Sequence, residues 1–182
     1  MTSKGFSHVG MATLDLDKTR EFYEGVLGFP AVRCDWIDLT DGGKIRHIFF
    51  DTGRDQLLAF MEITGAPTVP KEFDASINKA LGLPTIAFHY AFEAGNLAAL
   101  EAKRQELVAK GVKVSPVVDH DWAKSIYFKD PNGIQLEFCT ITRPFVADDA
   151  VMQKRFEASL KGLNMEDDVD VKNADGTSAV ER

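Results

Sequence analysis

The sequence predicts an α+β protein in which two βαβββ modules form a shared cleft. The same order of strand, helix and hairpin patterns occurs twice along the 182 residues. Each copy opens with a short apolar strand that has a histidine at its centre, His8 in the first copy and His89 in the second. Each copy closes with two apolar runs around a turn-forming centre, DTGRD or DPNG, which is typical of a β-hairpin.

A helix is expected after the opening strand of each copy. In FSHVGMATLDLDKTREFYEGVLGF, Asp17 is expected to cap the helix and Gly28 to end it. In IAFHYAFEAGNLAALEAKRQELVAKGV, Asn96 and Gly111 are expected to do the same. Start and stop signals at matching places indicate a duplicated unit.

The organisation of the chain follows from this repeat. We expect a first module over residues 1–64, a connection containing proline and glycine over 65–84 and a second module over 85–143. Residues 144–182 are expected to form a C-terminal helix, over Val146–Leu163, and a solvated acidic tail.

Composition excludes several classes of partner. The net charge of −7 argues against nucleic acid, because phosphate binding requires a basic surface. No apolar run approaches the roughly 18 residues needed to cross a bilayer, and the N-terminus has no secretory pattern, so no membrane association is expected. The two cysteines, Cys34 and Cys139, are too few for a disulfide framework, and a reducing, cytoplasmic location is the simplest expectation.

Aligning the two hairpins predicts a metal site. When LLAF of the first copy is placed on QLEF of the second, Ala59 falls where Glu137 falls. Two modules related by a pseudo-twofold axis then bring four corresponding positions to one cleft, and these hold His8, Ala59, His89 and Glu137. Three of the four are metal-ligand types, so His8, His89 and Glu137 are the predicted ligands.

Two imidazoles and one carboxylate leave open positions on the ion. This is the facial arrangement of non-haem Fe(II) oxygenases, where substrate and O2 bind side by side. Two histidines and a glutamate with one water also make a catalytic zinc set, so ligand types alone leave a zinc hydrolase open. The alternative for each histidine is a satisfied core residue, and for Glu137 it is a surface glutamate.

Three further residues are candidates for proton transfer. Tyr127 lies ten residues before Glu137 across the DPNG hairpin, on the matching side, and His120 precedes its strand. His47 has the same strand parity as Phe49 and is expected on the cleft face. Histidine and tyrosine near an ion can take a proton from a phenol. The alternatives are a loop histidine at His120 and an ordinary strand aromatic at Tyr127.

The sequence also predicts where several side chains near the candidate site residues lie. Glu62 is an odd number of residues from Ala59, so it is expected to point away from the cleft. Arg46, on the face opposite His47, is expected to be solvated. The aromatic residues expected to line an apolar pocket are Phe49, Phe60 and Trp122.

The paired modules resemble the vicinal oxygen chelate superfamily, which includes glyoxalase I, fosfomycin and bleomycin resistance proteins and type I extradiol dioxygenases. The resemblance covers about residues 5–142 and includes HVGMATLDLDKTREFYEGVLGF. The stretch VDHDWAKSIYFKDPNGIQLE is similar to the motif of extradiol ring-cleavage dioxygenases. The residues that meet its required positions are Val118, His120, Ile126, Tyr127, Asp130, Pro131, Gly133 and Glu137.

The resemblance implies His8, His89 and Glu137 as ligands of Fe(II), less often of Mn(II) or another divalent ion. It implies that Tyr127 and His120 orient a bound catecholate. Members of the family usually have another active-site histidine shortly before the second ligand histidine, which the run LGLPTIAF lacks. By its place in the fold, His47 is the candidate to substitute for it.

The expected function is that of an extradiol-type dioxygenase, an oxidoreductase that opens an aromatic diol with O2. One alternative is a non-redox metalloenzyme of the same superfamily, such as a glyoxalase-like lyase, an isomerase or a thiol transferase. Another is a metal-free protein that binds a small molecule or confers resistance to it. Because modules of this type pair within one chain or between two, a homo-oligomer is among the expected assemblies.

Overall fold

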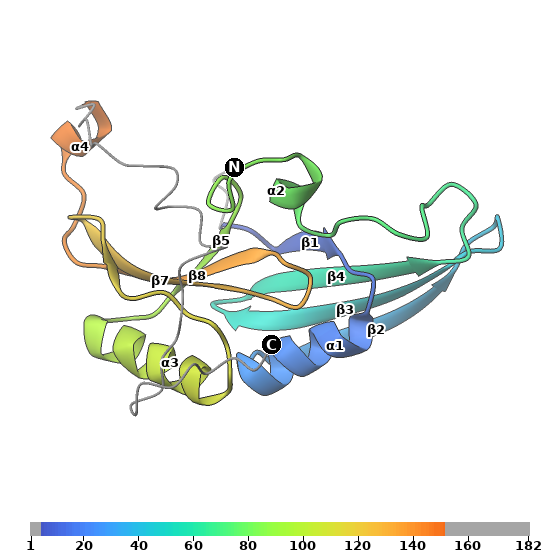
Figure 1. The fold of residues 1–182 in the computed structure, drawn as a ribbon, viewed down its shortest axis with the longest axis horizontal. Helices are drawn as coiled ribbons and strands as arrows, with labels where there is room; N and C mark the ends of the chain where they lie inside the picture. The colour runs from blue at the N-terminus through green and yellow to red at the C-terminus, as the bar shows by residue number, and fades with distance from the viewer. Residues whose placement is uncertain (1–4, 152–182) are drawn as a thin grey trace. The chain divides into compact units, whose positions relative to one another are not determined.

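Two sets of βαβββ elements are present in the computed structural model, which describes residues 5–151 (Figure 1). The chain divides into two units. The first comprises the residues up to Ala80 together with Asp130–Ile134, and the second comprises the other described residues. Each unit is described by itself, and the module boundaries predicted from the sequence stay a prediction.

The first unit is a four-stranded sheet with the order β1-β4-β3-β2. Strand β1 is parallel to β4, and the other neighbours are antiparallel. The helix α1 continues with wider, π-helical turns as η1, in which the Leu27 N–H donates to the carbonyl of Phe22. The elements are β1 His8–Ala12, α1 Leu16–Arg20, η1 Glu21–Val26, β2 Ala31–Asp38, β3 Lys44–Gly53, β4 Gln56–Thr64 and α2 Ile77–Ala80.

The second unit repeats this topology with the strand order β5-β8-β7-β6. Strand β5 is parallel to β8, and β7 is antiparallel to both β8 and β6. The elements are β5 Tyr90–Glu93, α3 Leu97–Ala109, β6 Val118–Asp119, β7 Ala123–Lys129, β8 Gln135–Ile141 and α4 Ala147–Val151. The predicted α+β class and the duplicated βαβββ order are therefore confirmed.

Helix caps were predicted correctly in the second unit and only in part in the first. The Asn96 side chain accepts from the Ala99 N–H, and Gly111, at φ +80°, follows the helix. In the first unit, Gly28 has φ +80° as expected. The N-cap, however, is Asp15, whose backbone is extended and whose carboxylate accepts from the Lys18 N–H at 3.0 Å.

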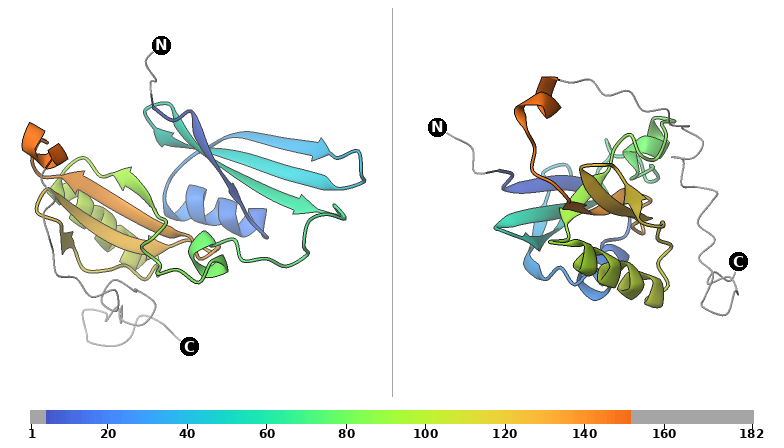
Figure 2. Two further views of the ribbon diagram at one scale, coloured as in Figure 1. Left: turned by 90° about the horizontal axis from the view of Figure 1, so that it is seen from above. Right: turned by 90° about the vertical axis from the view of Figure 1, so that its left-hand side faces the viewer.

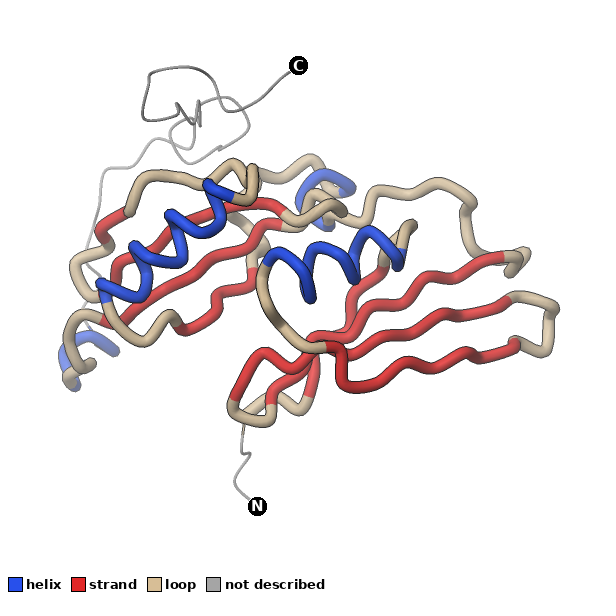
Figure 3. Tube along the Cα trace, turned by 90° about the horizontal axis from the view of Figure 1, so that it is seen from below, coloured by secondary structure: helices blue, strands red, loops and turns tan. Residues whose placement is uncertain are grey.

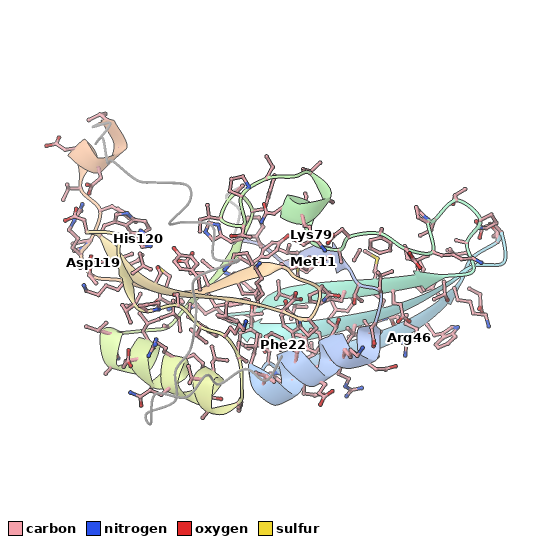
Figure 4. All side chains as sticks on the ribbon, in the orientation of Figure 1. Met11, Phe22, Arg46, Lys79, Asp119 and His120 are labelled. Carbon is pink, nitrogen blue, oxygen red and sulfur yellow. The ribbon has the colours of Figure 1, made fainter. Side chains whose placement is uncertain are left out.

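Asp17 is therefore not the cap. It lies within the first turn, and its carboxylate accepts from Arg46 Nη1 at 3.1 Å. Arg46 also donates to Glu62, at 2.9 Å from Nη2 to Oε1, so the prediction of a solvated arginine was wrong (Figure 4). Glu62 accepts in addition from the Leu16 N–H at 3.1 Å. This hydrogen bond joins the start of α1 to the sheet. The predicted orientation of Glu62, away from the face of Ala59, is therefore confirmed.

Side chains alternate between the two faces of each sheet. One face is covered by the helix of its unit, and the other, which this helix does not cover, is called the open face although several of its residues are buried. Figures 2 and 3 show α1 and α3 each lying against the strands of its own unit. In the first unit, the ring of Tyr23 stacks on Phe50 with centroids 5.3 Å apart and lies 4.8 Å from Phe60. Phe60 is thus fully buried on the helix side, opposite to the face of Phe49, and the prediction that it lines an apolar pocket together with Phe49 was wrong.

The core of the second unit forms in the same way, on the face of the sheet that packs against α3. Among its buried residues are Leu100 and Leu107 of the helix and Ile126, Phe128 and Leu136 of the strands. Contacts of α3 with β7 and β8 bury this apolar face, which stabilises the unit.

The DPNG turn is anchored by a buried carboxylate. Asp130 Oδ1 accepts from the N–H groups of Asn132 and Ile134, and Oδ2 accepts from the Tyr23 hydroxyl at 3.2 Å. Asn132 in turn accepts from the Thr13 hydroxyl at 2.7 Å. Burial raises the pKa of Asp130 although these hydrogen bonds favour its ionised form. This motif aspartate therefore has a structural role in the first unit.

The C-terminal part is described only as far as Val151. The short helix α4 covers the start of the predicted helix Val146–Leu163, and the remainder of that prediction lies outside the described residues. Within the described residues, no helix has the length and apolar character needed to span a membrane.

Replacing Asp130 tests this anchor. The variant Asp130→Ala leaves buried N–H and O–H groups without an acceptor, so we expect the free energy of unfolding to fall by about 3 kcal/mol. Tyr23→Phe removes one hydrogen bond, and we expect a loss of about 1 kcal/mol. Urea unfolding measures both. Equal losses in the two variants would contradict the anchoring role of Asp130.

Candidate functional site

Residues from three strands form one row on the open face of the second sheet. Strand register places Ala91 of β5, Glu137 of β8 and Tyr127 of β7 side by side. Glu137 and Tyr127 are both buried, with 5% and 6% of their surfaces exposed. The matching side predicted for Tyr127 and Glu137 is therefore confirmed. Two residues before Ala91, His89 approaches the same row.

His89 is held at both ring nitrogens. Its Nδ1 lies 2.9 Å from the carbonyl oxygen of Ile86. Because a carbonyl oxygen only accepts, Nδ1 carries the proton and donates it. Its Nε2 lies 3.1 Å from Glu137 Oε2. The ring is thereby oriented with its second nitrogen toward a carboxylate.

This contact sets the charge of both groups. Hydrogen bonding to Glu137 raises the pKa of His89 against the opposing effect of burial. Burial is the largest single effect on Glu137 and opposes its ionisation, but the hydrogen bond with His89, the nearby Ser125 hydroxyl and the charges of His89 and His120 together lower the pKa of Glu137 below its usual range. A lone pair on Nε2 and a carboxylate oxygen repel one another, so the contact requires a cation between them or a proton on the ring.

Tyr127 and His120 form the second polar pair of this face. The Tyr127 hydroxyl lies 2.9 Å from His120 Nε2. The His120 backbone N–H donates to the carbonyl of Ala123, which closes the turn between β6 and β7. This turn brings the imidazole of His120, which is labelled in Figure 4, next to the Tyr127 hydroxyl. Burial, and then the charge of Glu137, raise the pKa of Tyr127, so the phenol keeps its proton near neutral pH.

Ser125 is a member of this face that sequence reasoning missed. It lies directly opposite Cys139 in the register, two residues from Tyr127 along β7. Its Oγ is buried and makes no close hydrogen bond in the part of the chain that the structure describes. It is near enough to Glu137 to lower the pKa of that carboxyl. The signal available in the sequence was its even spacing from Tyr127.

The first sheet carries the other candidates on its own open face. Register aligns Phe49 with Ala59 and His47 with Met61, so the predicted common face of His47 and Phe49 is confirmed. The rings of His8 and His47 both lie against Phe49, with centroids 5.7 Å and 4.3 Å away. His8 is exposed, and its Nδ1 lies 3.1 Å from the Ser7 hydroxyl.

His47 has an unsatisfied ring nitrogen. Its Nε2 is buried and has no hydrogen-bond partner among residues 5–151. Burial lowers the pKa of His47, so the ring is neutral at pH 7. A neutral imidazole with an unused nitrogen can donate or accept one hydrogen bond to a small molecule.

The two units correspond position by position. Gly10, Ala59 and Phe49 form a row in the first sheet that matches the row of Ala91, Glu137 and Tyr127 in the second. His8 and His89 each lie two residues before their row. The alignment of Ala59 with Glu137 made from the sequence is confirmed by this register.

Comparison with known proteins identifies the family. The family model described as Glyoxalase/Bleomycin resistance protein/Dioxygenase superfamily matches residues 5–138. The chain belongs to this superfamily. A comparison of this superfamily member with curated proteins gave no match.

Solved structures of the same fold are similar to this superfamily member. The crystal structure of SMU.1112c is 29% identical, covers 76% of this chain and 99% of its own, and has a TM-score of 0.58. A glyoxalase family protein from Enterococcus faecalis is 25% identical, with coverages of 75% and 97% and a TM-score of 0.54. The fosfomycin resistance protein FosX from Listeria monocytogenes is 20% identical, with coverages of 78% and 96% and a TM-score of 0.54, which shows the fold alone.

The donor set of the second unit fits a divalent cation. A ligand histidine commonly donates its other ring N–H to a backbone carbonyl, as His89 does to Ile86. A cation between His89 Nε2 and Glu137 Oε2 would also remove the repulsion between these two acceptors. Imidazole and carboxylate together suit Fe(II), Mn(II) and Zn(II).

The structure unites some of the predicted site residues within each unit. In the second unit it brings together His89, Glu137, Tyr127 and His120, and in the first unit His8 and His47 flank one ring. Within residues 5–151, no three His, Cys, Asp or Glu side chains are gathered as a set that could hold an ion. A ligand set that adds His8 to His89 and Glu137 stays a prediction.

Histidine titration tests the electrostatics of this superfamily member. In the metal-free protein, NMR should give His89 a pKa above 6.5 and His47 a pKa below 6.5. Glu137→Gln removes the charged acceptor and should lower the pKa of His89, while that of His47 stays unchanged. An unchanged pKa of His89 in Glu137→Gln would contradict the contact.

Proposed function

We propose that the protein is a metal-dependent enzyme that acts on a small molecule with two neighbouring oxygen atoms. His89, Glu137 and His8 would hold the divalent ion, with Fe(II) as the first candidate and Mn(II) as the second. The observation that carries this proposal is the orientation of His89, whose Nε2 lies 3.1 Å from Glu137 Oε2 while Nδ1 donates to the carbonyl of Ile86. Oriented ligands of this kind are typical of metal centres.

We propose ring opening of an aromatic diol beside its hydroxyl groups, with O2 as co-substrate, as the reaction. The support is the hydrogen-bonded pair of Tyr127 and His120 next to Glu137, in a stretch whose spacing resembles the extradiol motif. A diol must lose a proton on binding to a cation, and a histidine near neutrality is suited to receive it.

The chain itself would orient the diol and move its proton. Tyr127 keeps its own proton, since burial raises its pKa, and its hydroxyl would donate to His120 Nε2 when the imidazole carries its proton on Nδ1. A diol hydroxyl that approaches Tyr127 can pass its proton to the phenol oxygen while the phenol proton passes to His120. The tyrosine stays neutral throughout, and the proton is held on His120 Nε2. His47, neutral and with an unused Nε2, is proposed to hold a proton near the substrate in a later step.

A bound Fe(II) ion would supply the electron transfer to O2, which no side chain can supply. The cytoplasmic location expected from the sequence stays a prediction.

Metal binding is the first test. Anaerobic titration with Mn(II), followed by the EPR signal of the free ion, should show about one ion per chain. His89→Ala and Glu137→Gln should each weaken binding by about 100-fold or more. Glu93→Gln is the matched control, because Glu93 is exposed on the same face and lies opposite Cys139. Binding should also strengthen as pH rises through the pKa of His89, since a proton on Nε2 competes with the ion.

Equal binding by the wild type and by both ligand variants would contradict the proposed centre.

Oxygen uptake is the second test. The protein loaded with Fe(II) should consume O2 with at least one member of a panel of catechols. Tyr127→Phe and His120→Gln should lower kcat by about 100-fold while the iron content stays unchanged, because the two residues move the proton and do not hold the ion. Iron binding without O2 uptake on any diol would exclude the dioxygenase reaction.

A non-redox reaction is the second candidate. One observation favours it: no histidine lies in Leu81–Phe88, where ring-cleaving dioxygenases usually have one shortly before the second ligand histidine. Isomerisation or addition at neighbouring oxygens needs a Lewis acid and a proton carrier, and not an additional acid for the ring-opening step. Turnover of such substrates with Mn(II) or Zn(II), together with no O2 uptake, would support this candidate.

A further inference from the structure

Strand β2 is the longest open edge among the described strands. Four strands lie at the ends of the two sheets: β1, β2, β5 and β6. Strand β2 has eight residues, whereas the other three have five, four and two. An edge strand presents a row of backbone N–H and C=O groups that can pair with another strand.

Several apolar side chains of β2 are exposed. Val32 is 54% exposed and Trp36 63% exposed, and Ile37 and Cys34 are exposed as well. A bulge at Val32 interrupts the register with β3, and beyond this bulge the strand contains no proline or lysine, which are residues that often protect an edge. The Ala31 N–H already donates to Glu24 Oε1, and the regular part of the strand that is available for pairing is Arg33–Asp38.

Symmetry limits how β2 could pair with itself. Two antiparallel copies in one sheet are related by a twofold axis perpendicular to the sheet, which passes through a single residue position. An axis at Arg33 would place two arginines opposite each other, and an axis at Asp35 would place two aspartates opposite each other. An axis at Cys34 places each Arg33 opposite Asp35 of the partner subunit.

The register centred on Cys34 also gathers charged side chains on one face of the sheet. Arg33 and Asp35 share the open face, because their partners in β3 are Phe49 and His47. Within the chain they already form an ion pair, with 2.8 Å between Arg33 Nε and Asp35 Oδ2. Pairing would convert this ion pair into a cluster of two positive and two negative charges.

We propose that β2 is a dimerisation edge, at which two copies of this chain join their first sheets through antiparallel pairing centred on Cys34. Opposite charges directly across two strands are favourable and like charges are unfavourable, so the charges select this register. The inference is independent of the proposed reaction, since Arg33, Cys34 and Asp35 take no part in it.

A charge swap tests the register. Sedimentation velocity of the full chain over a range of concentrations should show a dimer. Arg33→Asp and Asp35→Arg should each weaken dimerisation by about tenfold or more, because each change places like charges at two symmetry-related contacts. The double variant Arg33→Asp/Asp35→Arg restores opposite charges and should restore the dimer. Circular dichroism verifies that each variant is folded.

Mild oxidation provides a second readout. Directly opposed residues of antiparallel strands have Cα atoms at a distance that a disulfide can span. The dimer should therefore become covalently linked in the wild type and in Cys139→Ser, but not in Cys34→Ser.

Every outcome of these experiments either supports or overturns the proposed dimer. Loss of the dimer in the single variants, its recovery in the double variant and linkage through Cys34 support it. A monomer at all concentrations overturns it. A dimer that neither charge reversal weakens and that does not link through Cys34 uses another surface, and it overturns the proposal as well.

Discussion

The contact between His89 Nε2 and Glu137 Oε2 is the interaction on which the candidate site depends. At 3.1 Å, two acceptor atoms cannot face one another without a positive charge between them or on one of them. The metal-free protein meets this requirement with a proton, and the raised pKa of His89 and the lowered pKa of Glu137 are its consequences. In the proposed metal centre a divalent ion would meet the same requirement, and the proton would be released. The ion and the proton would thus compete for His89 Nε2.

Strand register places Glu137 and Tyr127 side by side on one face of the second sheet. Because side chains alternate between faces, a shift of one residue in β8 would move Glu137 to the helix-covered side and Phe138 to the open side. The DPNG turn, anchored by Asp130, lies between β7 and β8 and so helps to set the register that aligns Tyr127 with Glu137. The motif therefore combines residues for chemistry with a residue that holds the turn.

Much of the fold could be predicted from the sequence, because duplication and strand alternation can both be recognised from the order of residue types alone. They correctly located the repeat, the face of Glu62 and the equivalence of Ala59 and Glu137. Predictions failed where tertiary contacts decide between similar local choices. Asp15 and Asp17 are both reasonable caps, and the presence of Arg46 beside the helix decides which one is used. Arg46 itself is held because Glu62 points toward the helix.

For the site, sequence spacing predicted which residues share a face, but not what orients them. The carbonyl of Ile86 orients the His89 ring, and Ser125 contributes to the lowered pKa of Glu137. Residue type alone does not reveal either of these roles. The most direct test of the central claim is a crystal structure of the protein soaked anaerobically with Mn(II), with anomalous scattering data. We predict one peak at bonding distance from both His89 Nε2 and Glu137 Oε2. A protein in which these two atoms remain in direct contact, with Mn(II) bound elsewhere or not at all, would contradict the account.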